Sequence, residues 1–458
     1  MTRRSFMLNP LVYTPCESET QLVFIVSTDN VIRTLDASSG DLIHERIVAK
    51  PHPQDALYCT GIAENIGIMG TPTIDPATDI AYFYAKSYIP GYRLENETSA
   101  IFNGVYYFYA VDINTLEDVP GFPILVDGLP AENYPRKIFI GGRILQRTSL
   151  VQVGEFVYAG FGGLCDQFNY TGTILGVDVV ANFVTQAGPE SGFTLDWTSW
   201  HAGGAGGVWQ SGMSIASDGE NIYFVTDNGG SSPNHKRPST GTSPLDLLSE
   251  TAVKMSVSST RPLQLAGYFQ PYDYLDDDGF DLGSGGFTIL PNSTFYTPAH
   301  RQLAVAAGKS GKIYIIPLDS LGGYGNGVNN TDAVVQVIQA LPLQEGASFS
   351  SGIYGGVGAY PFTSDAGVAG GYIYAAAVAQ PLIAYELRQT PSGDDVEFVS
   401  AGQSVEISLN KPGVGVPTIT TALDKETGGE KKGSGIVWLT DPGAGLRAWY
   451  AIPDEEKS

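Results

Sequence analysis

Residues 22–42 read LVFIVSTDNVIRTLDASSGDL: a β run, a tight turn, a second β run and an Asp-containing turn. The composition of the two runs, on either side of Thr28-Asp29-Asn30, predicts a pair of antiparallel strands. Units of strand and turn of this kind recur about seven times along the chain. The predicted units cover residues 22–48, 69–126, 145–190, 207–269, 282–342, 348–404 and 414–452.

A repeat of this length, built only from strands and turns, is typical of a β-propeller. No blade can bury both faces of its own sheet, so the blades must close into one folding unit around a channel. We therefore predict an all-β, seven-bladed β-propeller that forms a single domain over residues 1–458. The last unit is short of one strand. Residues 7–14 are apolar enough to supply it, so we expect an N-terminal strand to close the ring.

The composition and net charge of the chain limit the classes of molecule that it is expected to bind. The chain has 56 Gly and 28 Pro, which suits many tight turns, and 25 Tyr and 20 Phe, which suit half-buried strands. Its net charge of −23 repels phosphates, which disfavours binding to nucleic acid or anionic membranes. No apolar run reaches the roughly 18 residues of a membrane span. We expect small-molecule substrates, no nucleic acid and no membrane insertion.

The cysteines and the N-glycosylation sequons give indications of the cellular compartment of the protein. Cys16, Cys59 and Cys165 cannot all pair within one chain, and the sequence does not choose a pair. The N-terminus lacks a long apolar region, which is compatible with an intracellular protein or with a removed signal peptide. The acidity and the sequons favour secretion as a glycoprotein. The sequons lie at Asn96, Asn169, Asn292 and Asn329.

Four stretches resemble the quinoprotein-like (PQQ-like) β-propeller family. Residues 67–78 read GIMGTPTIDPAT, residues 207–212 GVWQSG, residues 281–286 DLGSGG and residues 307–314 AGKSGKIY. The matches occur in order, and the resemblance covers roughly residues 57–452. It implies the propeller fold.

The redox function of that family carries over poorly. Its quinone-dependent members repeat a docking motif, A-x-D-x-x-T-G-x-x-x-W. Around Asp36 this chain has His44 in place of the Trp, and around Asp112 it has Leu116 for the Gly and Pro120 for the Trp. No two cysteines are adjacent, and no C-x-x-C-H haem site occurs. We therefore expect no cofactor.

The chain also looks similar to a narrower group, the fungal hetero-Diels–Alderases of secondary metabolism. These enzymes join a tropolone-derived quinone methide to a humulene-type sesquiterpene, and the resemblance implies a cofactor-free enzyme of this kind. Two alternatives stay open at this point. One is a PQQ-dependent oxidoreductase, and the other is a secreted binding or scaffold propeller without catalysis.

A cycloaddition needs an apolar, aromatic cavity that orients two reactants. Trp209 and Gln210 follow a glycine run near the expected channel, and Trp200 and His201 lie just before it. We predict that these residues form a ligand wall, with Tyr58 as a further substrate contact. The structural alternative for Trp209 is a ring wedged between blades, and the Trp200-His201 loop could merely cover a blade.

Forming a quinone methide by loss of water also needs an acid, a base or a cation. We predict Lys309, Arg147 and His201 as the catalytic groups, and Arg143 as a substrate contact. The alternatives are an exposed turn lysine and blade-to-blade salt bridges. We expect no metal site. The five histidines are scattered. Residues 273–278 are rich in oxygen ligands, but an EF-hand register with Gly279 at the turn puts Tyr274 and Gly285 at the first and last ligand positions, where Asp and Glu belong.

Overall fold

The computed structural model describes the chain from residue 11 to residue 453 with gaps. No helix among the described residues is long and apolar enough to cross a membrane. The described ranges are 11–16, 20–54, 64–93, 101–133, 135, 137–164, 170–179, 193–198, 206–227, 248–258, 263–274, 281–341, 352–363, 369–392, 395–410, 413–422, 431 and 433–453.

Seven sheets of three to five strands follow one another along the chain, and each overlaps one of the predicted repeats. They confirm the predicted class, an all-β, seven-bladed β-propeller. By its contacts the chain divides into two compact units. Unit 1 comprises Met1–Ile215 and Val257–Gln264, and unit 2 comprises Ala216–Ser256 and Leu265–Ser458. The single domain stays a prediction.

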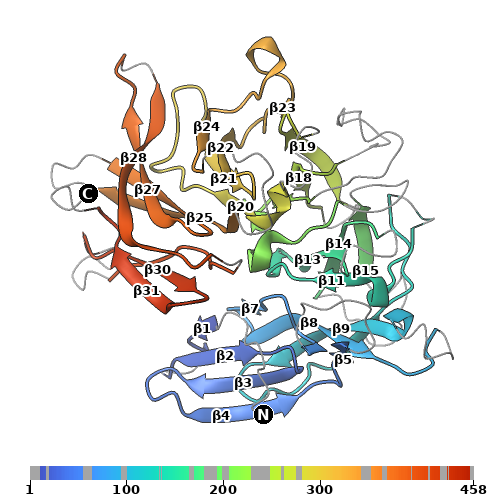
Figure 1. Cartoon of the computed structure of the whole chain (residues 1–458). Helices are drawn as coiled ribbons and strands as arrows, with labels where there is room; N and C mark the ends of the chain where they lie inside the picture. Colours follow the sequence, from blue (N-terminus) through green and yellow to red (C-terminus); the bar gives the residue numbers. More distant parts are fainter. Residues whose placement is uncertain are drawn as a thin grey trace. The chain divides into compact units, whose positions relative to one another are not determined.

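Unit 1 holds the first three sheets, all antiparallel, and a two-stranded ribbon. The first sheet is drawn in blue in Figure 1. Its strands are β1 (Leu11–Tyr13), β2 (Leu22–Val26), β3 (Val31–Asp36) and β4 (Leu42–Ile47). The second sheet has β7 (Thr73–Asp75), β8 (Ile80–Tyr88), β9 (Gly104–Asp112) and β10 (Ile124–Val126). The third has β11 (Ile144–Gln146), β12 (Val151–Val153), β13 (Phe156–Gly163), β14 (Thr173–Asp178) and β15 (Phe193–Thr198). The ribbon pairs β5 (His52–Pro53) with β6 (Asn65–Ile66), and two 3-10 turns are η3 (Gly141–Arg143) and η5 (Gln210–Gly212).

Unit 2 holds the other four sheets. The fourth sheet has β16 (Ala216–Ser217), β17 (Asn221–Val225), β18 (Ala252–Ser256), β19 (Gln264–Gln270) and β23 (Gly323–Tyr324). The fifth has β20 (Phe287–Ile289), β21 (Leu303–Ala307), β22 (Lys312–Pro317) and β24 (Gln336–Gln339). The sixth has β25 (Ile353–Thr363), β26 (Ala369–Ala377), β27 (Pro381–Gln389) and β28 (Val396–Ile407). The last has β29 (Thr418–Thr420), β30 (Ile436–Asp441) and β31 (Gly445–Tyr450), and the 3-10 turns of this unit are η6 (Leu282–Ser284) and η7 (Val328–Asn330).

The predicted closing strand pairs elsewhere. Within residues 7–14, the described part forms β1, which pairs antiparallel with β2 of the first sheet, Val12 opposite Val23. The last sheet contains β29, β30 and β31 among the described residues, without β1. The described part of the predicted closing strand, residues 11–14, therefore belongs to the first sheet and not to the last. A neighbour a few residues along the chain needs only a short loop closure, so β1 pairs locally.

Inner strands are buried on both faces because a sheet lies on each side. In β8, Phe83 and Ala85 contribute to the core shared with the first sheet, whereas Tyr82 and Tyr84 contribute to the core shared with the third. Successive side chains of a strand point to opposite faces, which explains the alternation. The aromatic-rich sequence of β8 thus serves two interfaces, each stabilised by large buried rings.

The degenerate docking motifs act as hairpin turns. The Asp36 Oδ1 atom accepts hydrogen bonds from the backbone N–H groups of Ser38 (2.7 Å) and Ser39 (3.0 Å). Asp112 caps its own turn in the same way. Leu116, in the place of the motif's Gly, has a left-handed φ of 59°. That conformation costs about 1–2 kcal/mol, but the side chain is 2% exposed and packs in the core of unit 1, which offsets the cost.

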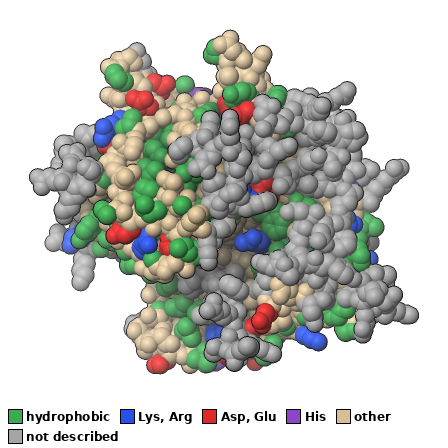
Figure 2. All heavy atoms as spheres, in the orientation of Figure 1, with side chains coloured by type: hydrophobic (Ala, Val, Ile, Leu, Met, Phe, Trp, Pro, Cys, Tyr) green, Lys and Arg blue, Asp and Glu red, His purple; other side chains and the backbone are tan. Residues whose placement is uncertain are grey.

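One face of the molecule shows how its charged side chains are distributed. On the face drawn in Figure 2, the acidic and basic side chains lie scattered among hydrophobic and neutral groups rather than in one patch. On this face the described residues form no extended basic patch.

Candidate functional site

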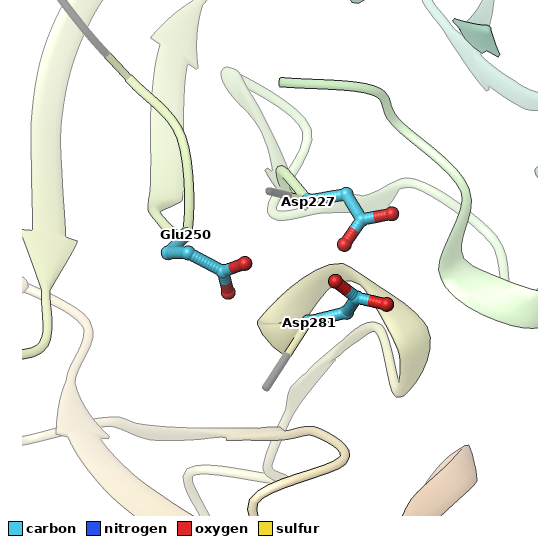
Figure 3. Close-up of side chains that lie close together, drawn as sticks. All are labelled: Asp227, Glu250 and Asp281. Atoms are coloured by element: carbon cyan, nitrogen blue, oxygen red, sulfur yellow. The ribbon is translucent and has the colours of Figure 1, made fainter. Parts of the chain in front are cut away.

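Three carboxylates from three separate segments meet in unit 2. Asp227 follows β17, Glu250 precedes β18 and Asp281 immediately precedes η6. One carboxylate oxygen from each lies within 4.8 Å of one from each of the other two. Figure 3 shows the three side chains converging on one another. We call these residues the carboxylate cluster.

Backbone hydrogen bonds fix the positions of the three segments. The N–H of Glu250 donates to the Asp227 carbonyl (3.1 Å), and the N–H of Leu282 donates to the Glu250 carboxylate (2.5 Å). Lys309, which follows β21, donates its N–H to the Asp281 carbonyl (3.3 Å). The cluster is therefore carried on backbone that is bonded from segment to segment.

Glycines allow these segments to approach so closely. A Cβ on Gly283 would lie 2.8 Å from the Asp227 nitrogen, and one on Gly308 would lie 2.7 Å from the Asp281 carbonyl oxygen. A Cβ on Gly352 would overlap the backbone of Lys309. Only residues without a side chain fit at these three contacts.

Lys309 is the cation of the site. Its ammonium forms an ion pair with the Asp281 carboxylate, and the two side chains are 16% and 7% exposed. The Tyr354 ring lies 5.5 Å from the Lys309 Nζ atom, in cation–π geometry. The structural alternative, an exposed turn lysine, is therefore wrong. A pair this buried is costly to break by removing one partner.

Like charges are close together at this site. Among the described residues, three carboxylates and the Lys309 ammonium lie together in a largely buried place. Carboxylates this close repel one another, so a proton or a further cation at the cluster lowers the repulsion. The site is suited to taking up either one.

A small cavity adjoins the cluster. Its volume is about 20 Å³, enough for one water molecule. Lys312 forms an ion pair with Asp273 at this cavity. Burial, and then the Asp273 charge, raise the pKa of nearby Asp332 to about 6. We call this space the water-sized cavity; it is lined by Glu250, Pro271, Asp273, Tyr274, Leu282, Ser310 and Tyr314.

Two of the predicted site residues in unit 1, Trp209 and Gln210, have structural roles. Trp209 packs on the apolar cluster that includes Leu145 and Leu164, with its ring against Gly162. Gln210 is fully buried and donates through Nε2 to the Ser214 carbonyl (2.9 Å). The predicted contacts of both residues with a ligand stay predictions.

The predicted arginines also lie in unit 1. Arg143 ends η3, and burial lowers the pKa of its guanidinium. Arg147 keeps an exposed side chain, although desolvation by surrounding protein lowers its pKa as well. Their roles stay predictions. Tyr58, Trp200 and His201 lie outside the described residues, as do Cys59 and Cys165.

The sequence analysis named Lys309, whose catalytic role stays a prediction, and did not name the carboxylate cluster. Asp281 and Lys309 each stand in a glycine-containing stretch that carries the family resemblance, 281–286 and 307–314, and this shared setting was the available signal. Glu250 carried no such signal, because a single acidic residue between polar neighbours does not indicate a functional site.

The residues of the cluster suit a hard divalent cation. Carboxylate oxygens are the ligands that Ca²⁺ prefers, and three of them converge here. The expectation of no metal site rested on the histidines and on residues 273–278, neither of which supplies this donor set.

The sequence matches no protein-family model and no curated protein. Among solved structures, the chain is similar to a quinohemoprotein alcohol dehydrogenase from Pseudomonas putida HK5 (11% identity, TM-score 0.43), covering 98% of this chain and 62% of that one. It therefore spans less than two thirds of that enzyme's length. A quinohemoprotein alcohol dehydrogenase from Comamonas testosteroni is 10% identical over 96% of this chain and 73% of its own, with TM-score 0.45. A europium-containing methanol dehydrogenase is 12% identical over 97% and 83%, with TM-score 0.46. A shared fold does not fix the chemistry, which depends on the site.

Proposed function

We propose that the protein is an enzyme that carries out acid–base chemistry on a small organic substrate at the carboxylate cluster of unit 2. The observation that supports this proposal is the ammonium of Lys309, 16% exposed and paired with Asp281, beside two further carboxylates and the water-sized cavity. Proton donors, proton acceptors and a fixed cation are thus within reach of one another. No redox cofactor is needed for this chemistry.

The specific reaction that we propose is an intermolecular hetero-Diels–Alder cycloaddition. In it a tropolone quinone methide, formed from its alcohol by loss of one water, joins a humulene-type sesquiterpene. The hydroxyl leaves with a proton from Glu250 as the C–O bond breaks, and the ring hydroxyl gives its proton to the Asp227 carboxylate. Proton transfer within the cluster then restores the starting state.

Lys309 has the electrophilic role in this scheme. Its ammonium stabilises the oxyanion that develops on the tropolone ring, and this stabilisation is larger in a desolvated site than in water. The water-sized cavity receives the departing water. The cycloaddition itself needs no charged group, because orientation of the two reactants supplies most of its acceleration.

The test is incubation of the purified protein with the tropolone alcohol and humulene, with product analysis against the uncatalysed background. Glu250→Gln should lower turnover by about 100-fold or more, the usual loss for a general acid. Lys254→Met is the matched control, because Lys254 also lies over a tyrosine ring, that of Tyr223, but away from the cluster. No product above background, or full activity in Glu250→Gln, would show that the proposal is wrong.

Lys309 needs a variant that keeps the fold. Lys309→Met alone leaves the buried Asp281 charge unpaired, so the double variant Lys309→Met/Asp281→Asn removes both charges together. We expect the double variant to stay folded and to lose turnover more than substrate affinity. An active double variant would exclude the electrophilic role of Lys309.

A second candidate is a PQQ-dependent oxidoreductase, in which the quinone would accept the electrons that the substrate loses and a cation would assist. The three converging carboxylates favour it. Asp227, Glu250 and Asp281 would hold the cation, which would act as a Lewis acid on a substrate oxygen. Titration with Ca²⁺ or La³⁺, followed by thermal unfolding, tests this candidate. It predicts a higher Tm for the native protein and no change for Asp227→Asn. Equal curves with and without either ion would exclude it.

A further inference from the structure

A long connection between two strands of the fifth sheet shapes a groove in unit 2. Adjacent antiparallel strands are commonly joined by two to five residues, but β22 and β24 are joined by residues 318–335. Part of this connection forms β23, which joins the fourth sheet instead of the fifth. There β23 pairs parallel with β19, Phe269 opposite Gly323. Figure 1 shows β23 beside β19. The connection therefore spans the fourth and fifth sheets.

The groove beside this connection has the size of a ligand site. Its volume is about 560 Å³, within the range of roughly 300–1,000 Å³ that holds small molecules. Gly322, with φ of +97°, lies so close to the connection's return path that a Cβ would fall 2.5 Å from the Ala333 carbonyl oxygen. We call this space the loop groove; it is lined by Gly267, Tyr268, His300, Pro317, Ser320, Gly322, Gly323, Asn326 and Ala333.

A carboxylate holds the histidine of the groove in one orientation. The ring Nδ1 atom of His300 lies 3.1 Å from the nearer oxygen of Asp319, and the backbone N–H of His300 donates to the Thr297 hydroxyl (3.0 Å). A carboxylate only accepts, so Nδ1 carries the hydrogen and Nε2 is left as an acceptor in the neutral ring. This arrangement is common where a histidine contacts a ligand, and it lies in a different part of unit 2 from the carboxylate cluster.

The other polar groups that line the groove are neutral. Ser320 offers a hydroxyl and Tyr268 an aromatic ring. Asn326 donates through Nδ2 to the Gly322 carbonyl (2.9 Å), which leaves its side-chain oxygen to accept. An anionic ligand would meet the Asp319 carboxylate and a chain of net charge −23. A hydrocarbon would bury these polar groups without hydrogen bonds, which is costly.

We propose that the loop groove binds a neutral carbohydrate. A sugar ring combines an apolar C–H face, which suits the Tyr268 ring, with hydroxyls that donate to His300 Nε2 and to the Asn326 oxygen. Binding at this groove is independent of the reaction proposed for the carboxylate cluster.

Saturation-transfer NMR and calorimetry with maltotriose, cellotriose and chitotriose test this site on the native protein. We expect at least one trisaccharide to bind, and Tyr268→Ala and His300→Gln each to weaken it by about tenfold or more. Tyr450→Ala is the matched control, since Tyr450 is 78% exposed on β31; it should bind like the native protein. The Glu250→Gln variant should also keep binding, which separates this site from the proposed reaction.

Three results would overturn the proposal. The first is no binding of any of the three sugars to the native protein. The second is unchanged affinity in both groove variants while circular dichroism shows them folded. The third is glucuronate binding as tightly as the neutral sugars, because the groove is argued to reject anions.

Discussion

His52 should make the protein sensitive to mild acid. It lies in β5, is fully buried, and its Nδ1 atom donates to the Pro53 carbonyl (3.1 Å). Nε2 therefore carries no hydrogen in the folded state. Burial, and then the charge of nearby Lys86, lower the pKa of His52 to about 3. The ordinary value in an unfolded chain is about 6.5.

The sign and size of the effect follow from these two values. The folded state disfavours the proton, so the unfolded chain binds more protons between pH 6.5 and pH 3. Stability is fully present above about pH 6.5 and falls as the pH drops through this window. The loss is about 2 kcal/mol at pH 5 and about 4 kcal/mol at pH 3, and it approaches about 5 kcal/mol only below pH 3, at about 1.4 kcal/mol per pKa unit.

Urea denaturation of the native protein and of His52→Gln, at about pH 7.5 and pH 5, measures this effect. The difference in free energy of unfolding between the two proteins should change by about 2 kcal/mol between the two pH values. Tyr88→Phe is the control, because Tyr88 packs edge-on against the His52 ring at 5.2 Å and its replacement keeps the imidazole. If His52→Gln shows the same pH dependence as the native protein, His52 is not a buried neutral histidine.

Three further changes test the packing. Lys309→Met should lower the free energy of unfolding by about 3–5 kcal/mol, and adding Asp281→Asn should restore most of it; equal stability of the single and double variants in urea would contradict a buried ion pair. Leu116→Gly relieves the strain of a left-handed backbone but removes a buried side chain worth about 2–3 kcal/mol. We expect the free energy of unfolding to fall by about 1 kcal/mol; a higher Tm would show that the relief of backbone strain outweighs the lost burial. Gly308→Ala places a methyl group 2.7 Å from the Asp281 carbonyl oxygen and should cost about 1–3 kcal/mol, read as a lower Tm, whereas an unchanged Tm would show that this contact is loose.

The sequence predicts the sheets well because each depends on local pattern. Residues 22–42 contain two strand compositions and a turn, and β2 and β3 form there. Asp36 caps its turn through side-chain bonds to residues two and three positions on, an interaction that any Asp in a hairpin can make. Repeats of this kind can be predicted without information about distant parts of the chain.

The features that the sequence did not predict depend on distant pairings. β1 pairs with β2, and the apolar composition of residues 7–14 does not specify the partner strand. The carboxylate cluster joins Asp227, Glu250 and Asp281, whose separations along the chain follow no helical or strand period. Its geometry arises from glycine contacts between segments, and a glycine in a sequence does not reveal which backbone lies against it.

Those glycine contacts set the order in which the site can assemble. Asp227 rests against Gly283, Asp281 against Gly308, and Lys309 against Gly352, so each charged residue is supported by a segment synthesised later. During translation, with the N-terminal part emerging first, Asp227 and Asp281 lack these supports until the chain has passed residue 308, and Lys309 lacks its support until the chain has passed residue 352. A nascent chain or a fragment that ends before residue 308 would carry the acidic residues without their geometry.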